Sequence, residues 1–203
     1  LQTFLPLLVL LVVSFITTIL ANILLLDEIH SPSFLRNTIV PTSWIFRFLS
    51  QFTLIAFVAL GQALLIFSAG YVVFFLDLGG NIGPLLLVLF LLMGIYSLCG
   101  MAIAYFVKTK TTSLLFSVFF LLLNLLLGGV LYPVERMAAF MAGIASWIPF
   151  TVGISVIQQS LFYDVPFSSL LAPLGKLVIL LLLAFAFFLL GRLVYMYRSG
   201  QGH

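Results

Sequence analysis

The sequence predicts an all-α membrane protein with about five transmembrane helices, a short amphipathic helix at one membrane face and a re-entrant helical hairpin at the other. Composition is the first observation, since 64% of the 203 residues are hydrophobic and only 6% are charged. An average soluble domain has roughly 25% charged residues. The second observation is the length of the apolar runs, which reach the roughly 20 residues that a helix needs to cross a bilayer. Strands of a membrane barrel would be shorter and would alternate, so the helical interpretation is favoured.

Five apolar runs are long enough to cross a membrane as helices, and together they make one transmembrane domain over residues 1–203. They cover residues 4–26, 44–76, 85–107, 113–131 and 174–197. The second run exceeds the thickness of a bilayer, so we expect its first turns, with Trp44 and Arg47, to lie among the lipid headgroups.

Residues 27–43 form a polar interruption between the first two runs. A polar connection between two spanning helices has to lie at one face of the bilayer. Polar residues such as Ser33 and Arg36 alternate there with apolar ones, which predicts a short amphipathic helix in the membrane interface. We expect Pro41 to end this helix and Ser43 to cap the next one.

The basic residues are distributed unevenly over the two membrane faces that these spans define. Arg136 and Lys176 fall on one face, and six others fall on the opposite face: Arg36, Arg47, Lys108, Lys110, Arg192 and Arg198. The positive-inside rule then places residues 27–47, the turn at 108–112 and the C-terminus in the cytoplasm. The N-terminus would be outside, so we expect an upstream helix to be missing from this chain.

Residues 133–173 are apolar on average but are divided by four prolines. Two helix-sized pieces remain, 134–148 and 150–162, and neither spans a membrane comfortably. A re-entrant or interfacial hairpin on the outer face is therefore expected. The second piece carries a polar face made of Ser155, Gln158 and Gln159. This face could line an outer cavity or contact lipid headgroups, and the sequence does not distinguish the two.

The polar residues within the predicted spans are mild ones, such as Asn22, Ser117 and Asn124. Pumps for protons or metal ions place Asp, Glu, His or Arg in mid-membrane, which this chain does not. Hydrogen bonding between helices is the ordinary role of such residues. Asn124 is nevertheless also a candidate for lining a pathway, together with the outer polar face.

The residue sets on which catalysis and metal binding depend are missing from the sequence. The acidic residues fall at loop or interface positions, and no HExxH, GxSxG, Cys/His cluster or P-loop is present. We therefore expect no catalytic residue, no metal ligand and no cofactor bound by this chain. The charges form no basic stripe, so a nucleic-acid partner is not expected.

Two segments of the chain resemble permeases of the ABC type-2 transporter family, which includes exporters of drugs, lipids and polysaccharides. The family's cytoplasmic coupling segment has a Glu, a Gly-Thr-Leu-x-Arg-like run and a Pro, although Pro32 and Asn37 depart from that pattern here. The matching residues are Glu28, Ser33, Phe34, Arg36 and Pro41. The family's pattern after its fifth membrane helix resembles Gly128-Gly-Val-Leu-Tyr-Pro-Val-Glu-Arg-Met137 and the later Trp147-Ile-Pro-Phe-Thr-Val152, with Ala138 in place of a Pro.

This resemblance covers essentially the whole chain. It implies that the missing piece is the family's first helix, which an extracytoplasmic domain often follows in one branch of the family. It also implies a function. The chain would be the permease subunit of an ATP-driven exporter of hydrophobic or amphipathic substrate, in a bacterial or archaeal plasma membrane. Residues 27–43 would be a cytoplasmic coupling helix that docks a separate ATP-binding subunit, which would hold the ATP. A second permease copy or a related permease, and membrane lipid, are the other implied partners. The alternative is a non-transporting membrane scaffold or assembly subunit.

Overall fold

The computed structural model describes residues 4–30, 43–74, 82–107, 109–129, 134–162 and 165–200. Within these ranges the chain forms seven α-helices and one short 3-10 helix, η1. Their bounds are α1 (Phe4–His30), α3 (Trp44–Phe74), α4 (Ile82–Phe106), α5 (Lys110–Leu127), η1 (Val134–Arg136), α6 (Ala139–Ala145), α7 (Pro149–Phe162) and α8 (Phe167–Gly200). The all-helical class expected from the sequence is confirmed for this part of the chain.

Five of the described helices, α1, α3, α4, α5 and α8, are long and apolar enough to cross a membrane. The five long apolar helices expected from the sequence are therefore present. The helices α6 and α7 are bent by 77° at the break between them, which is the geometry of either a re-entrant loop or a broken sixth span. This break confirms that the segment from 134 to 162 is not one continuous helix.

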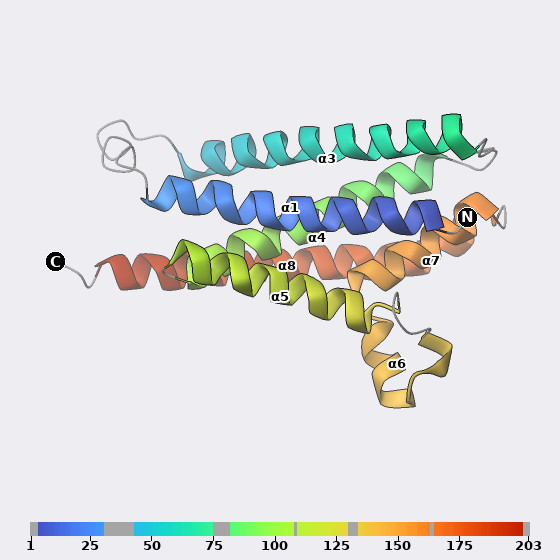
Figure 1. Ribbon diagram of the computed structural model, residues 1–203. Helices are drawn as coiled ribbons and strands as arrows, with labels where there is room; N and C mark the ends of the chain where they lie inside the picture. Colours follow the sequence, from blue (N-terminus) through green and yellow to red (C-terminus); the bar gives the residue numbers. More distant parts are fainter. Residues whose placement is uncertain are drawn as a thin grey trace.

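The helix α4 is the centre of the bundle (Figure 1). In its most apolar stretch 72% of the residues are buried, against 17% for α3 and for α5. Glycine permits its close approach to α1, because a Cβ atom on Gly100 would lie 2.3 Å from the carbonyl oxygen of Thr18. At the same contact the buried Asn22 of α1 donates to the carbonyl of Gly100 at 3.1 Å and to the hydroxyl of Ser113 at 2.8 Å. Asn22 therefore has the interhelical bonding role expected for mild polar residues.

The end of α1 differs from the sequence-based expectation. The helix continues to His30, so Asp27 and Glu28 belong to its last turns and not to a separate polar connection. A helix can continue beyond the apolar run because polar side chains at its end reach the aqueous interface without breaking the backbone ladder. Ser43 does cap the next helix as expected, since its hydroxyl accepts a hydrogen bond from the backbone N–H of Ile45 at 3.3 Å.

The start of α8 also corrects a predicted boundary, because the helix begins at Phe167 and runs through Pro173. We expected the broken segment to last until that proline and the final span to begin at residue 174. Pro173 costs only one backbone hydrogen bond in a helix of 34 residues. Membrane helices tolerate prolines because neighbouring helices, side chains and small backbone adjustments satisfy the backbone groups that a proline frees.

The end of α5 at Leu127 is four residues earlier than predicted, and two glycines explain it. The backbone N–H of Gly128 closes the last turn on the carbonyl of Asn124 at 2.8 Å. Gly129 then adopts a φ of +80°, a left-handed conformation that ends helices and that a residue with a side chain rarely takes. A Cβ atom there would also lie 2.6 Å from the side chain of Val134.

The two ends of the bundle differ in their number of basic residues. We call the end at which α1 and α8 finish and α3 and α5 begin the basic end, on the left in Figure 1. Four described basic residues lie there: Arg47, Lys110, Arg192 and Arg198. Arg136 and Lys176 belong to the opposite half of the bundle, whereas Arg36 and Lys108 lie outside the described residues.

Candidate functional site

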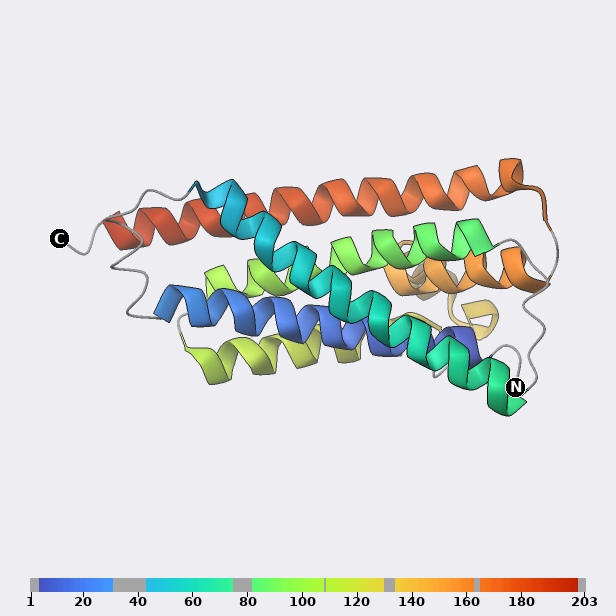
Figure 2. The same ribbon diagram turned by 90° about the horizontal axis from the view of Figure 1, so that it is seen from above.

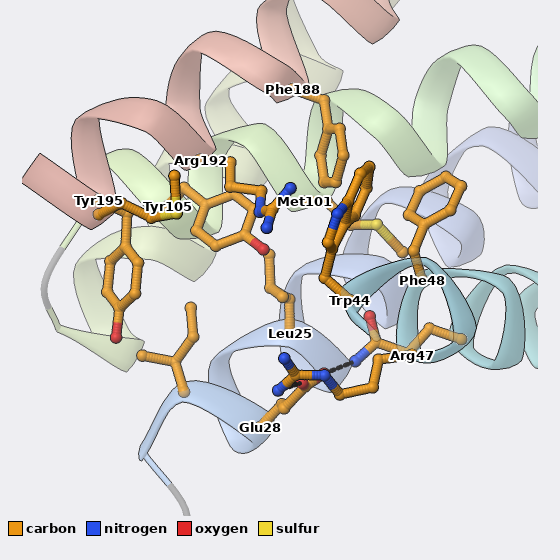
Figure 3. Close-up of a pocket in the computed structure, with 13 residues that line it drawn as sticks. Leu25, Glu28, Trp44, Arg47, Phe48, Met101, Tyr105, Phe188, Arg192 and Tyr195 are labelled. Carbon is orange, nitrogen blue, oxygen red and sulfur yellow. Dashed lines mark hydrogen bonds and ion pairs between the residues drawn. The ribbon is translucent and has the colours of Figure 1, made fainter. Parts of the chain in front are cut away.

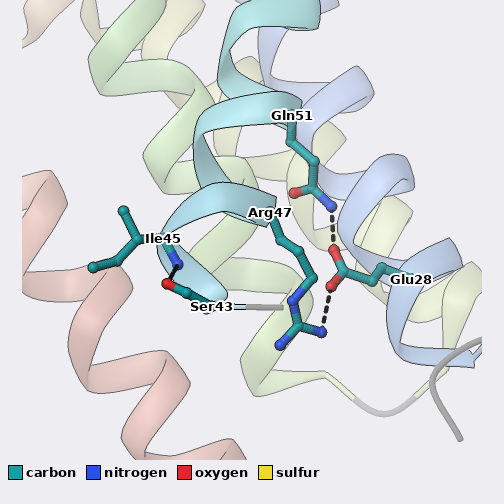
Figure 4. Close-up of polar contacts among 5 residues, drawn as sticks. All are labelled: Glu28, Ser43, Ile45, Arg47 and Gln51. Atoms are coloured by element: carbon teal, nitrogen blue, oxygen red, sulfur yellow. Dashed lines mark hydrogen bonds and ion pairs between the residues drawn. The ribbon is translucent and has the colours of Figure 1, made fainter. Parts of the chain in front are cut away.

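Glu28 joins the two helices that flank residues 31–42. Its carboxylate accepts a hydrogen bond from the guanidinium of Arg47 at 3.0 Å and another from the side-chain amide of Gln51 (Figure 4). Arg47 and Gln51 are four residues apart on α3 and so present their side chains on one face of that helix. The side chains of Glu28 and Arg47 are only 22% and 32% exposed. This half-buried pair ties the end of α1 to the start of α3.

The start of α3 is held from a second side by α8. The guanidinium carbon of Arg192 lies 3.9 Å from the centre of the Trp44 ring, in a cation–π contact (Figure 3). Trp44 is the first residue of α3, and Arg192 lies near the end of α8. Seen from above, α3 starts beside the end of α8 and crosses the bundle obliquely (Figure 2). The first turn of α3 is therefore connected both to α1 and to α8.

Two exposed contacts extend this set of connections. Lys110 at the start of α5 pairs with Asp27 on α1, and Arg198 on α8 donates to the backbone carbonyl of Phe106 on α4 at 3.2 Å. Exposed ion pairs contribute only about 0–1 kcal/mol, because water and salt screen them. The half-buried Glu28 pair is thus the stronger connection at the basic end.

A cavity of about 150 Å³ lies between these connections (Figure 3). Two guanidinium groups and one carboxylate line it, those of Arg47, Arg192 and Glu28, which leaves one net positive charge. The Nε atom of Arg47 is buried and has no hydrogen-bond partner among the described residues. The remaining lining is mainly aromatic and apolar: Leu25, Ile29, Trp44, Phe48, Gln51, Met101, Tyr105, Phe188, Tyr195 and Met196.

The described residues at this end connect helices through charged and cation–π contacts. In the part of the chain that the structure describes, no group of three or more His, Cys, Asp or Glu side chains could hold a metal ion. The contacts at this end form a charged junction between the long helices α1, α3 and α8. Two of them, α1 and α3, flank residues 31–42.

Of the coupling residues expected from the sequence, Glu28 is described and faces α3. Ser33, Phe34, Arg36 and Pro41 lie outside the described residues. Sequence reasoning missed Gln51 and Arg192 as members of this site. The spacing of Arg47 and Gln51 on one helix face was a usable signal, but nothing in the sequence indicated that α8 ends beside Trp44.

The outer residues expected from the sequence divide into two groups. Ser155 and Gln158 line a second cavity of about 470 Å³ between the end of α5, η1, α7 and α8. Gln159 is not among the described residues that line it. Asn124 belongs to a separate contact, because its side-chain oxygen accepts a hydrogen bond from the Tyr96 hydroxyl at 3.2 Å and its amide donates to the carbonyl of Phe120.

Comparison with known proteins gives the family. A family model described as ABC-2 type transporter matches residues 1–162, which include every described helix except α8. No curated protein and no solved structure matches. The membrane domain of this family lacks the ATPase domain, and its permeases generally pair with ATP-binding subunits. The chain therefore belongs to the ABC-2 type transporter family, as a membrane permease.

Proposed function

We propose that this chain is the permease subunit of an ATP-driven exporter and moves hydrophobic or amphipathic substrate across the membrane. Membership of the family supports the permease role, because its membrane domain lacks the ATPase domain and its permeases generally pair with ATP-binding subunits. The apolar spans, with few polar groups, suit cargo of the same character.

The observation that carries the proposal is the charged junction around residues 31–42. The basic end faces the cytoplasm in this proposal, because Lys and Arg concentrate on the cytoplasmic side of membrane proteins. An ATP-binding subunit would then contact residues 27–43. The Glu28 pair supports a lever role, since it joins the two spanning helices on either side of the docked segment.

Motion would pass from the docked segment into three helices together. Displacement of residues 27–43 would move α1 and α3 as one unit through Glu28 and Arg47. The contact of Trp44 with Arg192 would draw the end of α8 in the same direction. Rigid helices that share such contacts move as bodies, which is how small shifts at one face are carried across a membrane.

The proposal also gives the opposite end a role. There the bent pair α6 and α7 would form a re-entrant hairpin on the outer face, and the cavity lined by Ser155 and Gln158 would open toward it. A second permease copy, or a related permease, would complete the transport path with this chain.

Cysteine crosslinking to the ATP-binding subunit tests the docking face. In membranes that contain both subunits, Ser33→Cys is expected to crosslink to the ATP-binding subunit. Ser168→Cys, an exposed residue at the start of α8 on the opposite end, is the matched control and is expected not to crosslink. Crosslinking from Ser168→Cys and not from Ser33→Cys would reverse the orientation.

Reconstitution separates the exporter from the scaffold alternative. The two subunits in liposomes are expected to move a fluorescent amphipathic lipid across the bilayer only when ATP is supplied. Assembly of a stable complex that hydrolyses ATP but moves no amphiphile of several chemical classes would favour the scaffold role.

A further inference from the structure

The cavity of about 470 Å³ in the half of the bundle away from the basic end has two chemically different sides. The helix α7 supplies the polar residues Thr151, Ser155 and Gln158, which are three to four residues apart and so share one helix face. The helix α8 supplies Lys176. Ser146 and a set of mainly apolar residues, including Leu7 of α1, complete the lining.

Lys176 is the one charged side chain among the described residues that line this cavity. Its ammonium group lies 5.7 Å from the centre of the Trp147 ring. This is a cation–π contact with a neutral ring, so it does not neutralise the charge. No ion pair links Lys176 to another described residue. An ammonium group has three donors, so the positive charge remains available to an anion in the cavity.

A second polar group in the cavity is left without a partner. The hydroxyl oxygen of Thr151 is buried and has no hydrogen bond within the part of the chain that is described. Burying a hydroxyl without a partner is unfavourable, and a ligand oxygen beside it would satisfy the group. Gln158 offers a further amide donor on the same face of α7.

We propose that this cavity binds the phosphate headgroup of an anionic amphiphile such as phosphatidylglycerol. Lys176 would pair with the phosphate, Thr151 and Gln158 would donate to its oxygens, and the apolar lining would hold the adjoining carbon chain. A single ammonium beside neutral donors matches a phosphate diester, which carries one negative charge. This site goes beyond the exporter role and does not depend on it.

Trp147 provides a direct measurement, because the chain contains only two tryptophans. Trp44→Phe leaves Trp147 as the sole tryptophan, next to Lys176. The purified chain in neutral detergent is titrated with short-chain phosphatidylglycerol, with short-chain phosphatidylcholine and with glycerol phosphate. Phosphatidylglycerol is expected to change the Trp147 emission saturably, because pairing with phosphate draws the ammonium from the ring. The other two probes are expected to give much weaker responses.

Substitutions in the same background assign the response to this cavity. Lys176→Gln is expected to raise the apparent Kd for phosphatidylglycerol about tenfold or more, and Lys176→Arg to keep it near the starting value. Arg136→Gln removes an exposed positive charge from the same half of the chain and is expected to change the Kd less than twofold. Thr151→Val, which retains the shape of the side chain, is expected to raise the Kd several-fold.

The outcomes that overturn the proposal are distinct. Wild-type binding by both Lys176→Gln and Thr151→Val would exclude this cavity as the site. An equal loss in Arg136→Gln would assign the response to diffuse surface charge. Equal affinity for glycerol phosphate would show that the site binds a free phosphate anion and does not require the carbon chain of an amphiphile. Equal affinity for phosphatidylcholine would remove the charge selectivity on which the argument depends.

Discussion

Glu28 on α1 and Arg47 on α3 are 19 positions apart in the chain, yet their charged groups meet at 3.0 Å. The connection between them is the segment that resembles the coupling helix of the family. A half-buried ion pair therefore joins the two helices that flank residues 31–42, the segment that we propose docks an ATP-binding subunit.

Glu28→Ala is expected to lower transport-coupled ATP hydrolysis while the protein still inserts into membranes. The substitution leaves Arg47 half-buried without its carboxylate, so we also expect a loss of stability of about 1–3 kcal/mol. Coupled hydrolysis by the reconstituted complex and thermal unfolding of the purified chain are the two measurements. Arg136→Gln, a charge change in the opposite half, is the control and should leave both near the starting values.

A charge exchange separates the two roles that Glu28 could have. The double substitution Glu28→Arg and Arg47→Glu restores the pair within the chain but reverses the charge at residue 28. Recovery of coupling in the double variant would assign Glu28 to the junction between α1 and α3. Failure to recover coupling, with stability regained, would assign it to direct contact with the ATP-binding subunit.

Gly100→Ala is expected to destabilise the bundle, because the new Cβ atom would meet the carbonyl oxygen of Thr18 at 2.3 Å. Backbone atoms cannot move aside as a flexible side chain can, so α1 and α4 would have to separate. A loss of about 1–3 kcal/mol is expected, as for other overpacked interiors. The readout is the midpoint of thermal unfolding in detergent.

Gly61→Ala is the matched control for that substitution. Gly61 also lies within a long helix, α3, but a Cβ atom there would have no neighbour within 4 Å. Alanine is the better helix former, so the midpoint is expected to stay or to rise slightly. A fall of equal size in both variants would mean that glycine matters here for a reason other than packing.

Labelling of single cysteines checks the orientation that the charges predict. Thr109→Cys, at the exposed start of α5, should react with an impermeant thiol reagent only from the cytoplasmic side. Asn81→Cys, between α3 and α4, should react from outside. Cys99 is replaced by Ala in both variants to remove the native thiol. The opposite pattern of reactivity would contradict both the orientation and the docking face.

The spans were predictable from the sequence because their signal is cumulative. A run such as that in α4 is apolar over so many residues that no single position decides it. The boundaries were less predictable, since they depend on single groups. Glu28 lies in the last turns of α1 and contacts Arg47 and Gln51 on α3, a partnership that local sequence does not reveal. Pro173 stands within α8 although a proline usually favours a break.

The same distinction holds for the sites. Glu28 could be selected because its neighbours match a family motif, and Ser155 with Gln158 because they share a helix face. Lys176 and Arg192 could not, since each is a single basic residue at the edge of an apolar run. Each was identified by a contact in the folded chain. Lys176 lies near the Trp147 ring and Arg192 near the Trp44 ring.

The contact between Arg192 and Trp44 yields a last prediction, on how α8 takes part in coupling. Arg192→Gln removes the cation that lies 3.9 Å from the ring, and Trp44→Leu removes the ring while retaining an apolar side chain. Each is expected to weaken the contact by about 0.5–2 kcal/mol. If α8 moves with α3 through this contact, both substitutions should reduce coupled ATP hydrolysis. The double variant should be no worse than the more impaired single one, because the two residues would act through one interaction.

The comparison with Trp44→Phe makes this prediction selective. Phenylalanine keeps an aromatic face for the cation, so coupling should be largely retained in Trp44→Phe and largely lost in Trp44→Leu. Arg192→Lys should likewise retain more coupling than Arg192→Gln. A result in which all four substitutions impair coupling equally would point to packing around the cavity. If none of them alters coupling, force reaches the membrane through α1 and α3 alone, and the junction at Glu28 is sufficient.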